Sequence, residues 1–181
     1  MGMTGRFLFT SPRLGFRSWK ESDLDKLARL NADPEVMRYF PAPLSREKSR
    51  HLLVQLQEHL ACRGYTYYAT ELLSTGEFIG FIGLKHQEYM ADFTPATDIG
   101  WRLQKEFWGR GYASEGAKRC LDHAFDDLGL HRVVSVCPAL NTASERVMRK
   151  IGMQRQGAFE HPGLQGDPLL NPCVWYEVKK T

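Results

Sequence analysis

The chain has 181 residues, which suits one domain with a sizeable core. Hydrophobic residues make up 43% and charged residues 25%, and an aromatic content of 12% argues against a disordered chain. Lys and Arg number 24 against 21 Asp and Glu, a net charge of +3 that is too small to indicate nucleic-acid binding and mildly favours an anionic ligand. No apolar run approaches the roughly 20 residues that cross a bilayer. We therefore expect one domain over residues 1–181 that binds neither nucleic acid nor membrane.

The four cysteines are Cys62, Cys120, Cys137 and Cys173. They form no C-x-x-C pair and no spacing typical of zinc ligands. Residues 1–10 lack the apolar core of a signal peptide. We expect reduced, mostly buried thiols in a cytoplasmic protein, and no metal site.

The first third of the chain predicts one strand followed by helices. The strand covers residues 6–16 and turns at Ser11-Pro12. Ser22 predicts the N-cap of a helix with apolar residues at positions 24, 27, 28 and 30 on one face. Asp33-Pro34-Glu35 predicts a short second helix, because proline fits the first helical position.

A longer helix and a series of strands come next. Ser45 predicts the cap of that helix, and Gly64 predicts its end. The Val-rich segment 132–137 predicts a central strand. The order of elements indicates a mixed α/β sheet with helices on its faces. We expect the remaining strands at 65–72, 78–84, 97–103, 154–159 and 173–178, and helices at 112–128 and 141–151.

The segment Glu106-Phe107-Trp108-Gly109-Arg110-Gly111-Tyr112-Ala113 lies between a predicted strand and a predicted helix. A helix N-terminus offers unpaired N–H groups and positive dipole charge, and glycines let an anion approach the backbone. The segment therefore predicts a pyrophosphate cradle. An isolated G-x-G is also compatible with a plain tight turn. It is not a Walker loop, since no Gly-Lys-Ser/Thr follows, nor a Rossmann fingerprint, since Ser114 replaces the third glycine.

Further motifs surround this loop in a fixed order. Asp98-Ile99-Gly100-Trp101-Arg102-Leu103 precedes it, and a glycine inside a strand suggests a bulge or a close backbone approach. Asn141-Thr142-Ala143-Ser144 opens a helix after it, and residues 10–17 with Asp23-Leu24 form the opening motif. The chain resembles the GNAT superfamily of acetyltransferases over nearly its whole length. It resembles most the branch that includes acetyltransferases of ribosomal-protein N-termini and many that act on small amines.

The resemblance implies the GNAT fold, a mixed central sheet splayed by a β-bulge near Gly100, with helices on both faces. Acetyl-CoA, the co-substrate, would lie between strands 97–103 and 132–137, and no metal is implied. N-capping is an alternative explanation for Asn141, and a first-turn hydroxyl for Ser144. The implied CoA contacts are Gly100, Trp101, Arg102, Leu103, Trp108, Gly109, Arg110, Gly111, Tyr112, Ala113, Asn141 and Ser144.

The sequence departs from the family pattern at two points. Glu106 stands where the loop usually begins with Gln or Arg, so we expect it to turn away from the pyrophosphate and leave the contacts to backbone N–H groups, with help from Arg110. The helix at 141–151 lacks the Tyr that protonates the CoA thiolate in many members. Either Ser144 hydrogen-bonds the sulfur, or the thiolate leaves without a dedicated acid.

Direct attack on the thioester requires a neutral amine, whereas free amines are mostly protonated at neutral pH. The site therefore needs a base, and the first candidate is Asp98, which with Ser144 forms the predicted catalytic set. A surface or bridging carboxylate is the alternative reading of Asp98. His86 and Glu88 are weaker candidates. Backbone N–H groups near residues 99–101 would stabilise the oxyanion.

The resemblance leaves the acceptor open. It is either the α-amine of a protein N-terminus or a small amine, and a non-catalytic module that senses acyl-CoA is the alternative function. Residues 37–41 and 161–168 would border the acceptor cleft, although core aromatics and a surface loop explain them equally. An acidic cleft would favour a polycationic small molecule, and a wide one a peptide. Homodimers are frequent in the family, but no segment indicates an interface.

Overall fold

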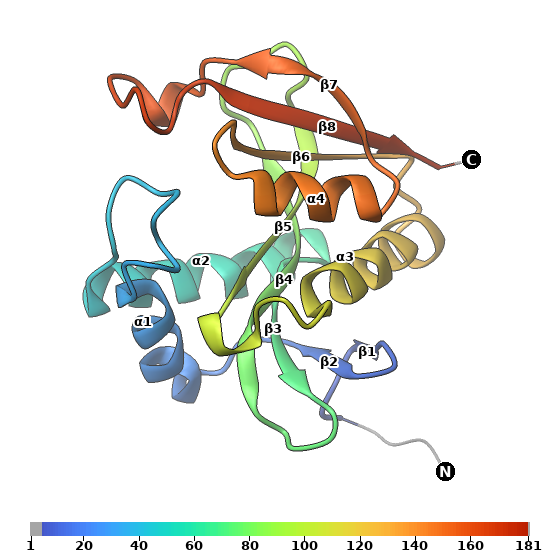
Figure 1. Cartoon of the computed structure of the whole chain (residues 1–181). Coiled ribbons are helices and arrows are strands. Elements are labelled where there is room, and N and C mark those ends of the chain that lie inside the picture. The colour runs from blue at the N-terminus through green and yellow to red at the C-terminus, as the bar shows by residue number, and fades with distance from the viewer. Residues whose placement is uncertain (1–4, 181) are drawn as a thin grey trace.

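The computed structural model describes residues 5–180, so residues 1–4 and 181 of the predicted domain lie outside the described part. One eight-stranded mixed sheet has the order β1-β2-β3-β4-β5-β6-β8-β7 (Figure 1). This confirms the predicted fold class. The strands are β1 (Phe9–Thr10), β2 (Leu14–Arg17), β3 (Tyr67–Leu72), β4 (Phe78–Gln87), β5 (Ala96–Leu103), β6 (Arg132–Pro138), β7 (Gln154–Phe159) and β8 (Cys173–Lys179). The α-helices are α1 (Leu24–Ala32), α2 (Arg46–Arg63), α3 (Tyr112–Asp122) and α4 (Thr142–Lys150).

The predicted first strand is a hairpin of β1 and β2, and its turn lies at Ser11 as expected. Ser22 is not a cap: it lies inside a 3-10 turn (Glu21–Asp23) that precedes α1. The Asp23 carboxylate accepts the Lys20 N–H at 2.9 Å and takes over the capping function at the start of this turn.

The short helix predicted at Asp33-Pro34-Glu35 is wrong, since residues 34–40 form consecutive turns. The Asp33 carboxylate accepts the Glu35 N–H at 2.8 Å. This is the bond of an N-cap, and the Met37 N–H donates to the Asp33 carbonyl at 3.0 Å, so one capped turn forms but no helix continues from it. The two ends of α2 are confirmed: Ser45 accepts the Lys48 N–H at 3.2 Å, and Gly64 ends the helix at φ 78°.

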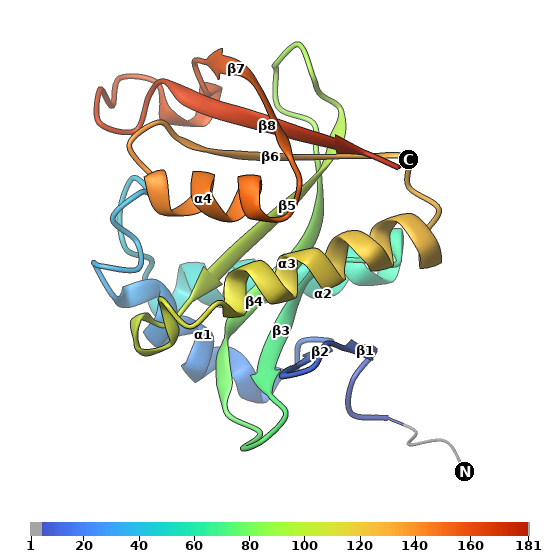
Figure 2. The ribbon, with the colours of Figure 1, turned by 45° about the vertical axis from the view of Figure 1, so that its right-hand side comes forward.

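Neighbouring residues of the strands pack into two different cores, because side chains alternate across a sheet. Ile82 packs with Ala117 and Leu121 of α3, whereas Phe81 packs with Leu27 of α1 and the leucines of α2. Figures 1 and 2 show α2 and α3 on opposite faces of the sheet. The predicted helix at 112–128 begins as α3 and continues as a π-helical turn (His123–Asp127) before Gly129.

The sheet opens between the parallel strands β5 and β6, which pair only at Asp98 and Val134. The predicted β-bulge near Gly100 is wrong: among residues 80–103, the register of β4 with β5 is continuous from Gly80–Leu103 to Gln87–Ala96. β6 instead keeps its full pairing with β8 over residues 132–138 and follows the twist of the C-terminal strands away from β5. The splay therefore comes from competition between two neighbours of β6.

The described cysteines are all unpaired, and Cys62 is exposed while the other three are buried. Within residues 5–180, no helix combines the length and apolar character needed to cross a membrane. In the same residues, no three His, Cys, Asp or Glu side chains form a cluster that could hold a metal ion.

Candidate active site

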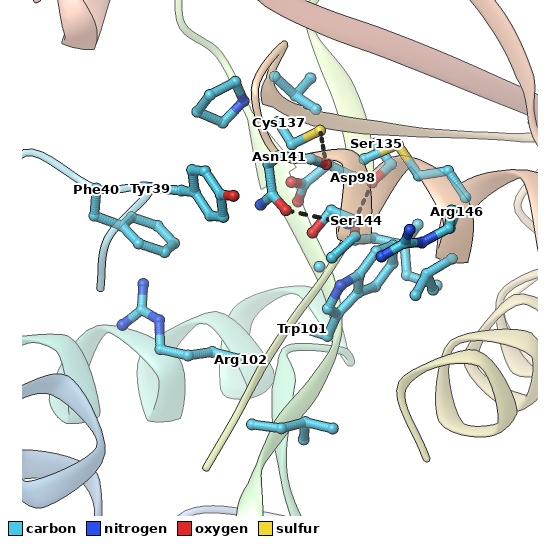
Figure 3. Close-up of a pocket in the computed structure, with 18 of the residues that line it drawn as sticks. Tyr39, Phe40, Asp98, Trp101, Arg102, Ser135, Cys137, Asn141, Ser144 and Arg146 are labelled. Carbon is cyan, nitrogen blue, oxygen red and sulfur yellow. Dashed lines mark hydrogen bonds between the residues drawn. The ribbon is translucent and has the colours of Figure 1, made fainter. Parts of the chain in front are cut away.

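A cleft of about 1180 Å³ opens where β5 and β6 diverge (Figure 3). Its walls come from β5, the end of β6, the length of α4 and the turns at residues 34–40. Of the predicted site residues, Arg110, Tyr112 and Ala113 do not line the cleft. The others line it: Asp98, Gly100, Trp101, Arg102, Leu103, Trp108, Gly109, Gly111, Asn141 and Ser144.

The backbone of β5 presents a free edge to this cleft. The Ile99 carbonyl accepts the Ser135 hydroxyl at 2.9 Å, and the Leu103 carbonyl accepts the Trp108 indole N–H at 2.9 Å. Because alternate residues of a strand direct their peptide groups to the same side, Trp101 also faces the cleft. Arg102, one residue further, faces β4 opposite Phe81. Its backbone is therefore not part of the free edge, unlike that of Trp101.

The glycine loop lies at the N-terminus of α3. Gly109 and Gly111 have φ of 73° and 80°, a region that favours glycine, and the space where a Cβ of Gly109 would stand is open. Glu106 is exposed, as expected. The Arg110 side chain lies 5.8 Å from the Phe107 ring and outside the cleft, so the cleft is lined here by glycines.

Two residues that the sequence analysis did not identify hold this loop in place. Arg13 donates to the Arg110 carbonyl at 3.1 Å and to the Glu115 carboxylate at 2.6 Å, and its guanidinium lies 4.4 Å from the Tyr112 ring centre. Glu115, in the first turn of α3, also accepts the Ser11 hydroxyl at 2.7 Å. Arg13 belongs to the opening motif of the family, and this motif was the one sign in the sequence that Arg13 has a role. The motif does not show that its partners are Arg110 and Glu115.

Asn141 and Ser144 meet at the first turn of α4. The Asn141 side-chain oxygen accepts the Ser144 N–H at 3.1 Å, so Asn141 is the N-cap. Figure 3 shows the amide nitrogen of Asn141 on the cleft side, away from the capping bond. One residue thus caps the helix and presents a donor to the cleft.

Asp98 lies in the cleft beside Tyr67, whose hydroxyl donates to both carboxylate oxygens at 2.7 and 2.9 Å. Burial raises the pKa of Asp98 to about 6, against the opposing effect of hydrogen bonds from Tyr67 and Gln87. A carboxylate with this pKa is ionised at neutral pH and is a stronger base than an ordinary Asp.

Tyr67 was missed by the sequence analysis, and two glycines explain how it reaches Asp98. In register, Tyr67 lies opposite Gly83, which lies opposite Gly100. A Cβ on Gly100 would come within 3.1 Å of the Tyr67 hydroxyl and 3.2 Å of its ring. Gly100 therefore leaves room for a side chain that crosses the strands. Gly83 and Gly100, which face each other on adjacent strands, were the sign in the sequence that a side chain crosses there.

The weaker candidates for the base lie outside the cleft. His86 pairs with the Glu88 carboxylate at 3.1 Å, and its backbone N–H donates to His59. These contacts give both residues a structural role at the end of β4.

Both segments expected to border the acceptor region do line the cleft. Arg38, Tyr39 and Phe40 come from one, and His161 and Leu164 from the other. Figure 3 shows the Tyr39 hydroxyl pointing across the cleft toward Asn141. The charged side chains of the lining are the acids Glu35 and Asp98 and the bases Arg38, Arg102, Arg146, Arg149 and Lys150.

Three comparisons place this geometry among known proteins. A family model described as an acetyltransferase (GNAT) domain matches residues 13–154. The chain is 30% identical over 151 residues to the uncharacterized N-acetyltransferase YnaD of Bacillus subtilis, covering 83% of this chain and 85% of that protein. It is 31% identical over 138 residues to the FsC-acetyl coenzyme A-N(2)-transacetylase of Aspergillus fumigatus, covering 72% and 58%. A crystal structure of a GNAT-family acetyltransferase from Bacillus anthracis superposes with a TM-score of 0.78 at 27% identity, covering 94% and 96%.

Proposed function

The chain belongs to the GNAT acetyltransferase family, and from that premise we propose that it transfers an acetyl group from acetyl-CoA to a primary amine by direct attack in a ternary complex. We take residues 1–181 as a single domain with this activity. The observation that carries the proposal is Asp98, a half-buried carboxylate with a pKa raised to about 6, at the point where β5 and β6 separate. The name of the Aspergillus relative supports acetyl-CoA as donor and nitrogen as acceptor.

Between Asp98 and the glycine loop, the residues that line the cleft fit acetyl-CoA. The N-terminus of α3 offers N–H groups to the pyrophosphate, and the open space beside Gly109 lets phosphate oxygens reach the backbone. The free edge of β5 offers the Trp101 carbonyl and the Leu103 N–H to the pantetheine amides, as in the addition of a strand. Arg146 lines the same side of the cleft, and its charge suits a phosphate.

The chemistry assigned to this chain is removal of a proton and stabilisation of charge. As the amine nitrogen bonds to the acetyl carbon, the carbon–sulfur bond breaks, CoA leaves as its thiolate, and the ammonium proton goes to Asp98. The Trp101 N–H, which faces the gap between the strands, is the donor for the developing oxyanion. The Ser144 hydroxyl, on the lining at the start of α4, is the donor for the sulfur.

The charge of the cleft bears on the acceptor. Apart from Arg146, which is assigned to a phosphate, four basic and two acidic side chains line it, so it is not the acidic cleft that a polycationic amine would need. We therefore disfavour polyamines and aminoglycosides as acceptors. Amino acids and protein N-termini fit the charge better.

Measurement of thiol release from acetyl-CoA with a panel of amines and N-terminal peptides tests this function. We expect release that depends on one class of acceptor and that disappears in the Asp98→Asn variant. Tight CoA binding by calorimetry without thiol release for any acceptor would overturn the proposal in favour of an acyl-CoA sensor.

A further inference from the structure

Arg102 carries a partly buried positive charge without a carboxylate partner. Its Nη1 donates to the Asn31 side-chain oxygen at 2.6 Å, and its guanidinium lies 4.2 Å from the Phe40 ring centre and 5.1 Å from that of Phe81. Its Nε is buried and makes no hydrogen bond within residues 5–180. No carboxylate in that range forms an ion pair with it.

An unpaired buried cation is expensive, because desolvation is not offset by an opposite charge. Burial lowers the pKa of Arg102 to about 10, so the group remains charged at neutral pH. Structural arginines of this chain are paired differently: Arg17, which is 4% exposed, binds both Asp23 and Glu71. The lone charge of Arg102 therefore indicates an anion that arrives with a ligand.

The guanidinium lies on the acceptor side of the cleft. Arg102 and Asp98 are both even-numbered residues of β5, so their side chains share the face of the sheet that packs on α1. The glycine loop opens α3, which covers the other face. CoA phosphates on that loop are consequently not the natural partner of Arg102.

We propose that Arg102 binds a carboxylate of the acceptor, so that the acceptor is an amine that carries its own carboxylate. The inference rests on the proposed function and narrows its acceptor. A guanidinium presents two N–H groups along the edge shared by Nε and Nη2, and these match the two oxygens of a carboxylate. The Phe40 ring, 40% exposed on its turn, covers the guanidinium and moves aside when the carboxylate binds.

The spacing on β5 sets the separation of the two acceptor groups. Asp98 and Arg102 lie four residues apart, which places their Cα atoms about 13 Å from each other along the strand. Both residues line the cleft, so an acceptor that reaches both side chains has to span a gap of this order. The amine and the carboxylate of the acceptor are therefore separated by several bonds, as in an ω-amino acid or a peptide with an acidic residue after its N-terminus.

A ladder of acceptors tests the proposal. Glycine, β-alanine, γ-aminobutyrate and ε-aminocaproate are each compared with their neutral amides, and a Ser-Glu peptide with a Ser-Gln peptide. For the best-spaced acceptor we expect kcat/KM to favour the acid over its amide by about 10- to 100-fold, the effect of one charged hydrogen-bonding pair. The amino-acid series tests a small acceptor, and the peptide pair tests a protein N-terminus.

The Arg102→Gln variant should lose this preference, with kcat/KM for the best acid falling to the value for its amide. Arg102→Lys should restore part of the preference for the acid. The lysine keeps the positive charge but lacks the two parallel N–H groups of the guanidinium edge. Arg29→Gln, a change to an exposed cation of α1, is the matched control and should keep the full preference. The melting temperature of Arg102→Gln is measured alongside, because the variant removes the donor to the buried Asn31 side-chain oxygen.

Calorimetry with the protein saturated by CoA gives a readout that does not depend on turnover. Wild-type protein should bind the best acid about 10-fold more tightly than its amide, and Arg102→Gln should bind both alike. Equal binding and equal rates of acids and amides in the wild type would overturn the carboxylate site but leave acetyl transfer intact. Absence of transfer to any amine would instead overturn the proposed function.

Discussion

The Tyr67 hydroxyl donates to both carboxylate oxygens of Asp98, at 2.7 and 2.9 Å. The Tyr67 ring stacks on Phe81 with 5.5 Å between ring centres, which fixes the direction of the hydroxyl. The two residues belong to β3 and β5, with β4 between them, so the contact spans three strands. Tyr67 is therefore a positioning residue that also stabilises the charged form of Asp98.

Removal of this hydrogen bond should shift the pH dependence of catalysis. In the wild type, kcat/KM should fall below an apparent pKa of about 6, because protonated Asp98 is not a base. The Tyr67 hydrogen bond lowers the pKa of Asp98, so Tyr67→Phe should raise it and move the acidic limb upward by about one pH unit. The measurement is a pH–rate profile with saturating acetyl-CoA.

Tyr68→Phe is the matched control for this shift. Tyr68 is the next residue, is fully buried, and its hydroxyl has no partner within residues 5–180. The acidic limb of the Tyr68→Phe pH–rate profile should coincide with that of the wild type. A Tyr67→Phe profile that also coincides would remove the proposed influence of Tyr67 on Asp98.

Asp98→Asn should lower kcat by about 100- to 10,000-fold, since the variant lacks the base but keeps the shape of the side chain. The dissociation constant of CoA should change by less than about twofold, because Asp98 faces the acceptor and not the glycine loop. Asp92→Asn, at an exposed position before β5, is the control and should retain full turnover. A half-active Asp98→Asn enzyme would exclude Asp98 as the base.

The glycine loop is tested by a carboxylate placed where the pyrophosphate is proposed to bind. Gly109→Asp should weaken CoA binding at least about 100-fold, through repulsion and lost access to the backbone. Gly129→Asp has a similar φ of 66° against 73°, with equally open surroundings, at the far end of the same helical segment. Both variants carry the same backbone strain, so only a difference in calorimetric affinity between them supports the assignment.

The sequence predicted most of the frame and part of the cleft, for identifiable reasons. The caps at Ser45 and Gly64 and the strand 132–137 follow from local rules, and the structure confirms them. The helix predicted at Asp33 stops after a capped turn, because Pro41 and Pro43 follow it closely and disfavour its continuation. The bulge near Gly100 failed because strand splay depends on competition between β5 and β8 for β6.

The unpredicted parts of the cleft are contacts between distant segments. Tyr67 and Arg13 act through residues 31 and 102 positions away along the chain, and no local pattern shows such pairing. The unpaired state of Arg102 is a similar case, since it depends on which carboxylates the fold leaves out of reach. Local periodicity carries no information of this kind.

A buried ion network beneath the N-terminal hairpin should dominate acid stability. Arg17 binds both oxygens of Asp23 at 2.6 and 2.8 Å and one of Glu71 at 2.8 Å. Asp23→Ala should lower the free energy of unfolding by about 3 kcal/mol, because a buried cation loses one of its two carboxylate partners. Asp25→Ala, whose partner Arg46 is exposed, should cost less than about 1 kcal/mol. Urea unfolding at pH 7 measures both.

The pH dependence of this network has a definite sign. Burial alone would raise the pKa of Asp23, but the Arg17 and Lys20 hydrogen bonds hold it below its usual range. The contribution is therefore complete above the unfolded-state pKa of about 4 and is lost as the pH falls through the lower folded-state pKa. Asp23→Ala should flatten the stability curve in this acidic window. An unaltered slope there would show that other carboxylates control acid unfolding.

Two substitutions at Asn141 separate its capping role from its proposed contact with CoA. Asn141→Asp keeps an oxygen that accepts the Ser144 N–H, so helix stability should be retained, but it replaces the amide donor on the cleft side by a negative charge. Asn141→Ala removes both and should cost about 1 kcal/mol of stability. We expect the Asp variant to melt like the wild type and yet bind CoA about 10-fold more weakly. Normal CoA affinity in Asn141→Asp would leave Asn141 as a cap alone, because the only property changed there is the group presented to the cleft.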